Sequence, residues 1–146
     1  MIQAYRPGQD RARPLLDDGR AEPPPETLGR PTAAQLVAAF ADAGLYGQLG
    51  FEIVGLELPP EDENDDARDL GTVYLSGDEP ARQPDAPVRV VTLYKPGEST
   101  LVATLAVRHL LGTVVVIADD DDLEDGLLFV RPDDDPVALA SVWPWP

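Results

Sequence analysis

Residues Thr113–Asp135 have the sequence TVVVIADDDDLEDGLLFVRPDDD, which contains the most apolar run of the chain, Val114–Ala118. A second apolar run, Leu127–Val130, follows after a connection of eight residues, and carboxylates follow each run. Short valine-rich runs that are bounded by polar turns are typical of buried strands. The stretch therefore predicts two core strands, Thr113–Ala118 and Leu127–Arg131. Their connection is longer than a tight hairpin, which favours antiparallel pairing without requiring it.

An amphipathic helix is predicted to begin after Thr32. Threonine is a good N-cap, and apolar residues at helical spacing, with Leu36 and Phe40 among them, form one stripe. Gly44 or Gly47 is expected to end the helix. The apolar stripe indicates that this helix lies on a core.

Three further strands are expected between this helix and the opening stretch. They lie at Phe51–Leu58, Leu70–Leu75 and Val88–Tyr94, where apolar and polar residues alternate. In the first of them Gly55 interrupts the alternation, which indicates a bulge. The polar and proline-containing segments between these strands are expected to be surface loops.

The segment Ser99–Leu111 fits two structures. As a helix it has Ser99 at its N-cap, basic residues in its last turn and Gly112 just after its end. As a strand it has alternating apolar residues and a suitable content of valine and threonine. We favour the helix because both of its end signals agree. A short helical turn is also expected at Val137–Val142, after Pro136.

The order of elements is a helix, three strands, a helix and two strands, which does not alternate as a doubly wound sheet does. We therefore predict an α+β fold: a single acidic domain at residues 32–146, with a mainly antiparallel sheet of about five strands packed with one or two helices. Residues 1–31 carry six of the 16 prolines, which predicts an extended, proline-rich N-terminal arm. The arm is either a loose tail or a segment that docks on this domain or on a neighbouring copy. Its candidate docking residues are Ile2, Tyr5, Leu15 and Leu16.

The chain has 146 residues and a net charge of −16. Residues 1–30 are neutral, so the excess lies in residues 31–146, which hold six basic and 22 acidic residues. Free nucleic acid and anionic membranes are unsuitable partners, because the phosphate attraction that dominates such binding would be reversed. A basic protein would be attracted, although an acidic surface also keeps a protein soluble without any partner. One lysine against ten arginines fits a coding bias or salt adaptation as well.

The first 30 residues lack the apolar core of a signal peptide, and no apolar run approaches the ~20 residues that span a membrane. The chain has no cysteine, which excludes disulfides, thiolate metal sites and cysteine nucleophiles. We expect a soluble, cytoplasmic protein without a cofactor.

The connection after the first core strand carries six carboxylates within seven residues: Asp119, Asp120, Asp121, Asp122, Glu124 and Asp125. Such carboxylates can share a calcium or magnesium ion. An EF-hand loop counted from Asp121 would place Leu123 at its third position and Pro132 at its last, so the spacing does not match. No glycine-rich phosphate loop follows, which disfavours phosphoryl transfer. The remaining alternatives are a contact with a basic protein, which we adopt, and a solvated turn that only raises solubility.

Further partner-binding residues are expected at the second acidic cluster and at the C-terminus. Two terminal tryptophans supply the large apolar area that is typical of binding hot spots, unless they fold back onto the core. If the acidic clusters share a face, they would imitate the phosphates of a nucleic acid or cover a basic active site, as an immunity protein does. These further residues are Asp133, Asp134, Asp135, Trp143 and Trp145.

Catalysis is not expected. His109 is the only histidine, and no carboxylate lies at helical spacing from it, so we interpret it as a structural residue near a helix end. The sequence thus favours a non-enzymatic acidic domain that binds a basic protein and inhibits or neutralises it. The alternatives are a structural or adaptor subunit of a larger assembly and a divalent-cation-binding domain that uses Asp119–Asp125.

Overall fold

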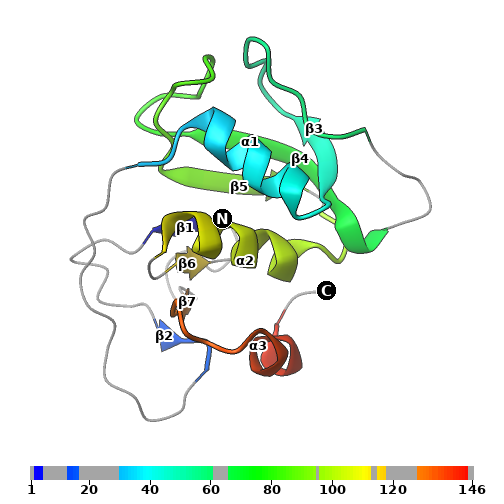
Figure 1. Ribbon diagram of the computed structural model, residues 1–146, viewed down its shortest axis with the longest axis vertical. Coiled ribbons are helices and arrows are strands. Elements are labelled where there is room, and N and C mark those ends of the chain that lie inside the picture. Colours follow the sequence, from blue (N-terminus) through cyan, green and yellow to red (C-terminus); the bar gives the residue numbers. More distant parts are fainter. Residues whose placement is uncertain are drawn as a thin grey trace.

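A computed structural model of the chain describes residues 2–4, 13–16, 30–60, 66–94, 96–112, 115–117 and 128–144 (Figure 1). These residues form an α+β fold in which three helices accompany a sheet, as the sequence predicts for the fold class. No helix in these ranges is long and apolar enough to cross a membrane.

The sheet has seven strands in the described part of the chain, in the order β2-β7-β6-β1-β5-β4-β3. The inner four pairings are antiparallel, whereas the two outermost pairings, β2 with β7 and β3 with β4, are parallel. β1 lies in the middle and joins the longer strands β3, β4 and β5 to the shorter strands β6, β7 and β2 (Figure 1). The strands are β1 (Ile2–Ala4), β2 (Arg13–Pro14), β3 (Tyr46–Leu49), β4 (Asp69–Ser76), β5 (Val90–Tyr94), β6 (Val115–Ile117) and β7 (Leu128–Val130).

β1 belongs to the predicted arm of residues 1–31 and lies against the domain. Ile2 is only 4% exposed, and it pairs with Val91 of β5 on one side and with Ile117 of β6 on the other. A strand with a neighbour on each side can place its backbone N–H and C=O groups in hydrogen bonds, and its apolar side chain is removed from water. Three residues from the start of the chain therefore complete the centre of the sheet.

A second part of the predicted arm also belongs to the fold. Leu15 and Leu16, which follow β2, pack against the core, and the Leu15 N–H donates to the Phe129 carbonyl at 3.0 Å. The alternative in which the arm docks on its own domain therefore holds for these residues and for β1. Residues 5–12 and 17–29 lie outside the described residues, and so does the prediction of an extended polyproline segment among them.

α1 (Ala33–Asp42) is the first predicted helix, and a capping box closes its N-terminus. The Thr32 hydroxyl accepts from the Gln35 N–H at 3.2 Å, and the Gln35 side chain accepts from the Thr32 N–H at 2.9 Å. The predicted stripe faces inward, because Leu36 and Phe40 are 1% and 0% exposed. The cap and the stripe together fix both the start and the orientation of this helix.

α2 (Thr100–Leu111) settles the ambiguous segment in favour of a helix. Gly112 ends it in a left-handed conformation, with φ of 66°, and donates its N–H to the Arg108 carbonyl at 2.8 Å. Ser99 occupies the N-cap position but does not cap the helix with its side chain. Its hydroxyl donates instead to the Asp69 carbonyl, which ties the start of α2 to the start of β4.

β4 and β5 confirm the second and third predicted strands, and β6 and β7 confirm the opening pair, which is antiparallel over all three residues. Along β4, Val73 and Leu75 are buried, whereas Thr72 and Tyr74 on the opposite face are half-buried. This period-two pattern is the one that the sequence predicted.

The predicted strand at Phe51–Leu58 is wrong. Ile53 and Leu58 both belong to the core, but they are an odd number of positions apart, and a regular strand would direct them to opposite faces. A turn at Val54 and Gly55, where Gly55 has φ of 74°, allows both side chains to reach the core. The strand in this region is β3, which lies just before the predicted one.

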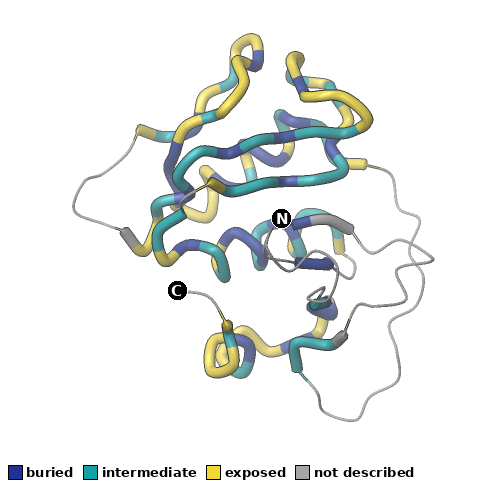
Figure 2. The backbone as a smooth tube through the Cα atoms, turned by 180° about the vertical axis from the view of Figure 1, so that it is seen from behind, coloured by how far each residue is buried: buried dark blue, intermediate teal, exposed yellow. Residues whose placement is uncertain are grey.

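The two longer helices lie side by side on one face of the sheet. In Figure 1, α1 lies over β4 and β5, and α2 lies over β1 and β6. Figure 2 shows buried residues along the strands and helices, whereas the two loops that extend from β3 and β4 are mostly exposed. α3 (Pro136–Val142), the predicted terminal turn, follows β7. It lies at the end of the molecule that holds the short strands β7 and β2 (Figure 1).

Candidate functional site

Most of the predicted partner-binding residues lie outside the described part of the chain. These are Asp119–Asp125 and Trp145, and their contact with a partner stays a prediction. The nearest described neighbours of the acidic connection, Ile117 and Leu128, are register partners on β6 and β7. In the ranges that the structure describes, no three acidic or histidine side chains are grouped to hold a metal ion.

The strand register places the two described acidic clusters at one end of the sheet. β4 begins and β6 ends at the same end, as their pairings through β5 and β1 require. β4 and β7 both finish at the opposite end, where Asp78 and Glu79 follow the first and Asp133–Asp135 follow the second. The two described clusters therefore follow strands that finish at the same end of the sheet.

Asp134 is 3% exposed and has a role inside the fold. Its Oδ2 accepts from the Arg131 N–H at 2.8 Å, and its Oδ1 lies 3.9 Å from Arg131 Nη1. Arg108 Nη1 donates to the carbonyls of Arg131 and Asp134 at 3.1 and 2.7 Å, and Arg131 Nη1 donates to the Leu16 carbonyl at 3.3 Å. This network joins α2, the end of β7 and the segment after β2. We therefore leave the Asp134 carboxylate out of the proposed contact surface.

The neighbouring carboxylates lie on the surface. Asp135 is exposed and is the N-cap of α3, where its side chain accepts from the Ala138 N–H at 3.1 Å. Asp133 is also exposed. Of the three residues in this cluster, these two thus present their side chains to solvent.

Trp143 is half-buried and packs against the core. Its Nε1 donates to Thr100 Oγ1 at 2.9 Å, which fastens the chain after α3 to the start of α2. This contact supports the alternative in which this tryptophan folds back onto the domain.

His109 lies near the end of α2 and is exposed. It lines a hollow of about 650 Å³ between α1 and α2, together with Gln35, Asp42 and apolar side chains of both helices. Apart from His109, Asp42 is the one ionisable side chain among the described residues that line this hollow.

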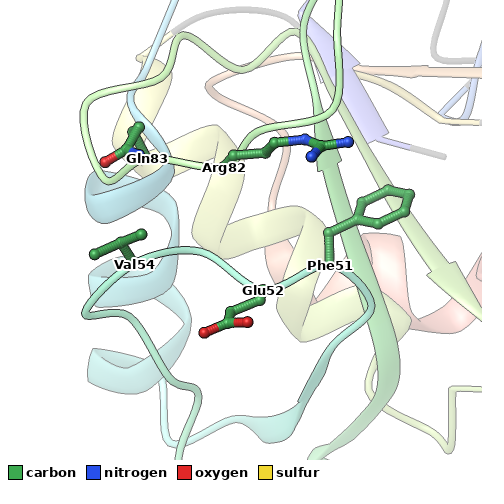
Figure 3. Close-up of a pocket in the computed structure, with 5 residues that line it drawn as sticks. All are labelled: Phe51, Glu52, Val54, Arg82 and Gln83. Atoms are coloured by element: carbon green, nitrogen blue, oxygen red, sulfur yellow. The ribbon is translucent and has the colours of Figure 1, made fainter.

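A notch of about 390 Å³ opens between the two exposed loops that extend from β3 and β4 (Figure 3). The exposed fractions of Phe51 and Val54 are 42% and 58%, which is high for large apolar residues. An aromatic ring and a guanidinium that are both accessible are typical of contact sites. The notch is lined by Phe51, Glu52, Val54, Arg82 and Gln83.

Buried residues next to the lining hold the two loops in place. Ile53, which precedes Val54, is 3% exposed, and Ala81, which precedes Arg82, is 2% exposed. The Val54 N–H also donates to the Arg82 carbonyl at 3.2 Å and so links the loops directly. The exposed side chains of the notch are thus displayed from anchored backbone.

The Phe51 ring rests on Tyr74 of β4. The two rings are in an edge-to-face arrangement, with centroids 5.2 Å apart and an interplanar angle of 71°. A Cβ atom at Gly50 would lie 2.2 Å from Cε1 of Tyr74, so only glycine lets the tyrosine ring approach the backbone there. Glycine at this position therefore leaves room for the ring against which Phe51 packs.

Replacing Gly50 with alanine is expected to lower the free energy of unfolding by about 1–3 kcal/mol, because the Tyr74 ring must move away from the new methyl group. Chemical denaturation monitored by fluorescence measures this change. In a Tyr74→Leu background the same substitution should cost clearly less. Equal costs in the two backgrounds would show that the ring is not the obstacle.

Sequence reasoning missed the notch because its lining residues come from two loops about 30 positions apart, and no local pattern connects them. The predicted strand at Phe51–Leu58 also placed Phe51 on the same face as Ile53. The available signal was Gly55, whose interruption of the alternation marks a turn rather than a bulge.

Comparison with protein-family models, with curated proteins and with solved structures found no match to the chain.

Proposed function

We propose that the chain is a non-enzymatic acidic domain that binds a basic protein and, by covering a basic surface, inhibits or neutralises it. The observation that carries the proposal is the unequal placement of charge in the fold. Several arginines are held by partners within the domain, whereas most of the described carboxylates are exposed.

Four of the arginines illustrate the first half of this observation. Arg131 is 7% exposed, and Arg108 donates to two backbone carbonyls. Arg30 and Arg89 both pair with Asp78, at 3.4 and 3.6 Å. Their positive charge is therefore partly masked or directed inward.

The carboxylates show the opposite placement. In the described ranges, all but two of the acidic side chains with assigned burial are exposed; the exceptions are the half-buried Asp69 and the buried Asp134. Exposed charge of one sign increases the rate at which an oppositely charged partner associates, and the effect falls as salt screens it. The exposed carboxylates are Asp42, Glu52, Glu57, Asp78, Glu79, Asp85, Glu98, Asp133 and Asp135.

The immobilised full chain should retain a basic protein from an extract of its source cell at low salt and release it as the salt concentration is raised. The isolated partner should then bind with an affinity that decreases steadily with ionic strength. If the partner carries an activity, that activity should decrease on binding. Binding that does not respond to salt would contradict the electrostatic basis of the proposal.

Replacing Asp120 and Asp121 together with asparagine is expected to weaken association roughly tenfold, because two charge pairs of up to about 1 kcal/mol each are lost. Titration calorimetry with the isolated partner measures the change, and thermal unfolding should be unaffected. The matched control replaces Asp42 and Asp85, two exposed carboxylates elsewhere on the domain, with asparagine. If both double variants lose the same affinity, the contact is not centred on Asp119–Asp125.

A further inference from the structure

We propose that the notch is a second binding site, distinct from the acidic contact, which takes a peptide segment of a partner carrying an aromatic or aliphatic side chain beside a carboxylate. This ligand is negatively charged, whereas the partner surface in the proposed function is basic. The proposal therefore stands or fails independently of the proposed function.

The positive half of the site is Arg82. Within the described ranges this exposed arginine makes no ion pair, although the chain holds 27 acidic residues against 11 basic ones. In contrast, Arg30 and Arg89 pair with Asp78. A guanidinium presents several donors in a planar fork that matches a carboxylate, so Arg82 is suited to an external acid.

The apolar half of the site is formed by Phe51 and Val54. In Figure 3 the Arg82 side chain extends toward the side of the notch on which the Phe51 ring lies. A ligand with a ring or a branched aliphatic group next to its carboxylate would thus cover exposed apolar surface while it reaches the guanidinium. The volume of about 390 Å³ is suited to one side chain with its adjoining backbone.

Glu52 restricts how such a ligand can lie. Its carboxylate points away from the Arg82 guanidinium (Figure 3). A ligand carboxylate is therefore attracted at one side of the notch and repelled at the other, which selects a single orientation. The anchored backbone at Ile53 and Ala81 lowers the ordering cost of binding, because the lining residues are already held in place.

The probe for this site is N-acetylphenylalanine, which carries a ring and a carboxylate, and the comparison probe is the uncharged N-acetylphenylalaninamide. Each is titrated into the isotopically labelled full chain, up to about 10 mM because a ligand of this size binds with a Kd on the order of millimolar. Amide resonances of Val54 and Gln83 are expected to shift with the acid. The amide probe and the Arg82→Gln variant are each expected to give at least threefold weaker binding.

The matched control is Arg30→Gln, which removes the same charge from an arginine that already pairs with Asp78. It should bind the acid within twofold of the unchanged chain, and all variants should unfold at similar temperatures. The proposal is overturned if the acid shifts no resonance of the notch, if it shifts them equally in Arg82→Gln, or if both probes bind alike.

Discussion

Replacing Ile2 with aspartate is expected to prevent the chain from folding. Ile2 is 4% exposed in β1, between Val91 and Ile117 on the two neighbouring strands. The substitution removes about 1.5–3 kcal/mol of apolar burial, and it places a carboxylate among apolar side chains at a cost of several kcal/mol more. A domain of ordinary stability, about 5–15 kcal/mol, does not tolerate a loss of this size at its centre.

Circular dichroism and thermal unfolding measure the outcome. Val137→Asp is the matched control, because Val137 is 77% exposed in the first turn of α3, where a carboxylate also suits the helix dipole. The control should unfold within a few degrees of the unchanged chain. A cooperative unfolding transition at an unchanged temperature for Ile2→Asp would mean that β1 does not contribute to the fold.

Replacing Asp134 with alanine is expected to lower the free energy of unfolding by about 3–5 kcal/mol. The substitution removes the acceptor of the Arg131 N–H and leaves the Arg131 side chain, which is 8% exposed, without its carboxylate. Urea denaturation measures the loss. Asp85→Ala, at an exposed position, is the control and should change the free energy by less than about 0.5 kcal/mol.

The double variant Arg131→Met with Asp134→Leu tests the reason for that loss. Removing both charged groups takes the buried guanidinium away together with its carboxylate, so the double variant should be more stable than Asp134→Ala alone. If the double variant instead loses as much stability as the single variants Arg131→Met and Asp134→Leu lose together, the pair contributes through packing rather than through charge.

The parts of the fold that could be predicted are those in which a local pattern and its end signals agree. α1 has an apolar stripe and a capping box, and α2 has a terminal glycine. β4, β5, β6 and β7 each have a run of apolar or alternating residues. In all of these, propensity and burial favour the same structure, so tertiary contacts confirm the local preference instead of overriding it.

The parts that could not be predicted depend on distant partners. β1 has three residues and β2 has two, which is too short for any periodicity, and only their pairing with strands far along the chain makes them strands. The turn at Gly55 is decided by the need to bury both Ile53 and Leu58. The prediction of the candidate site was limited in the same way. The sequence identifies the carboxylates but does not distinguish the buried Asp134 from its exposed neighbours.

The central position of β1 also has a consequence for synthesis on the ribosome. Ile2 emerges about 90 residues before its register partner Val91 and about 115 residues before its register partner Ile117. At about 5–20 residues per second, β1 waits on the order of 10 s for its neighbours. The centre of the sheet therefore closes only after Ile117 has been made, and during that interval β1 lacks the two strands that cover Ile2.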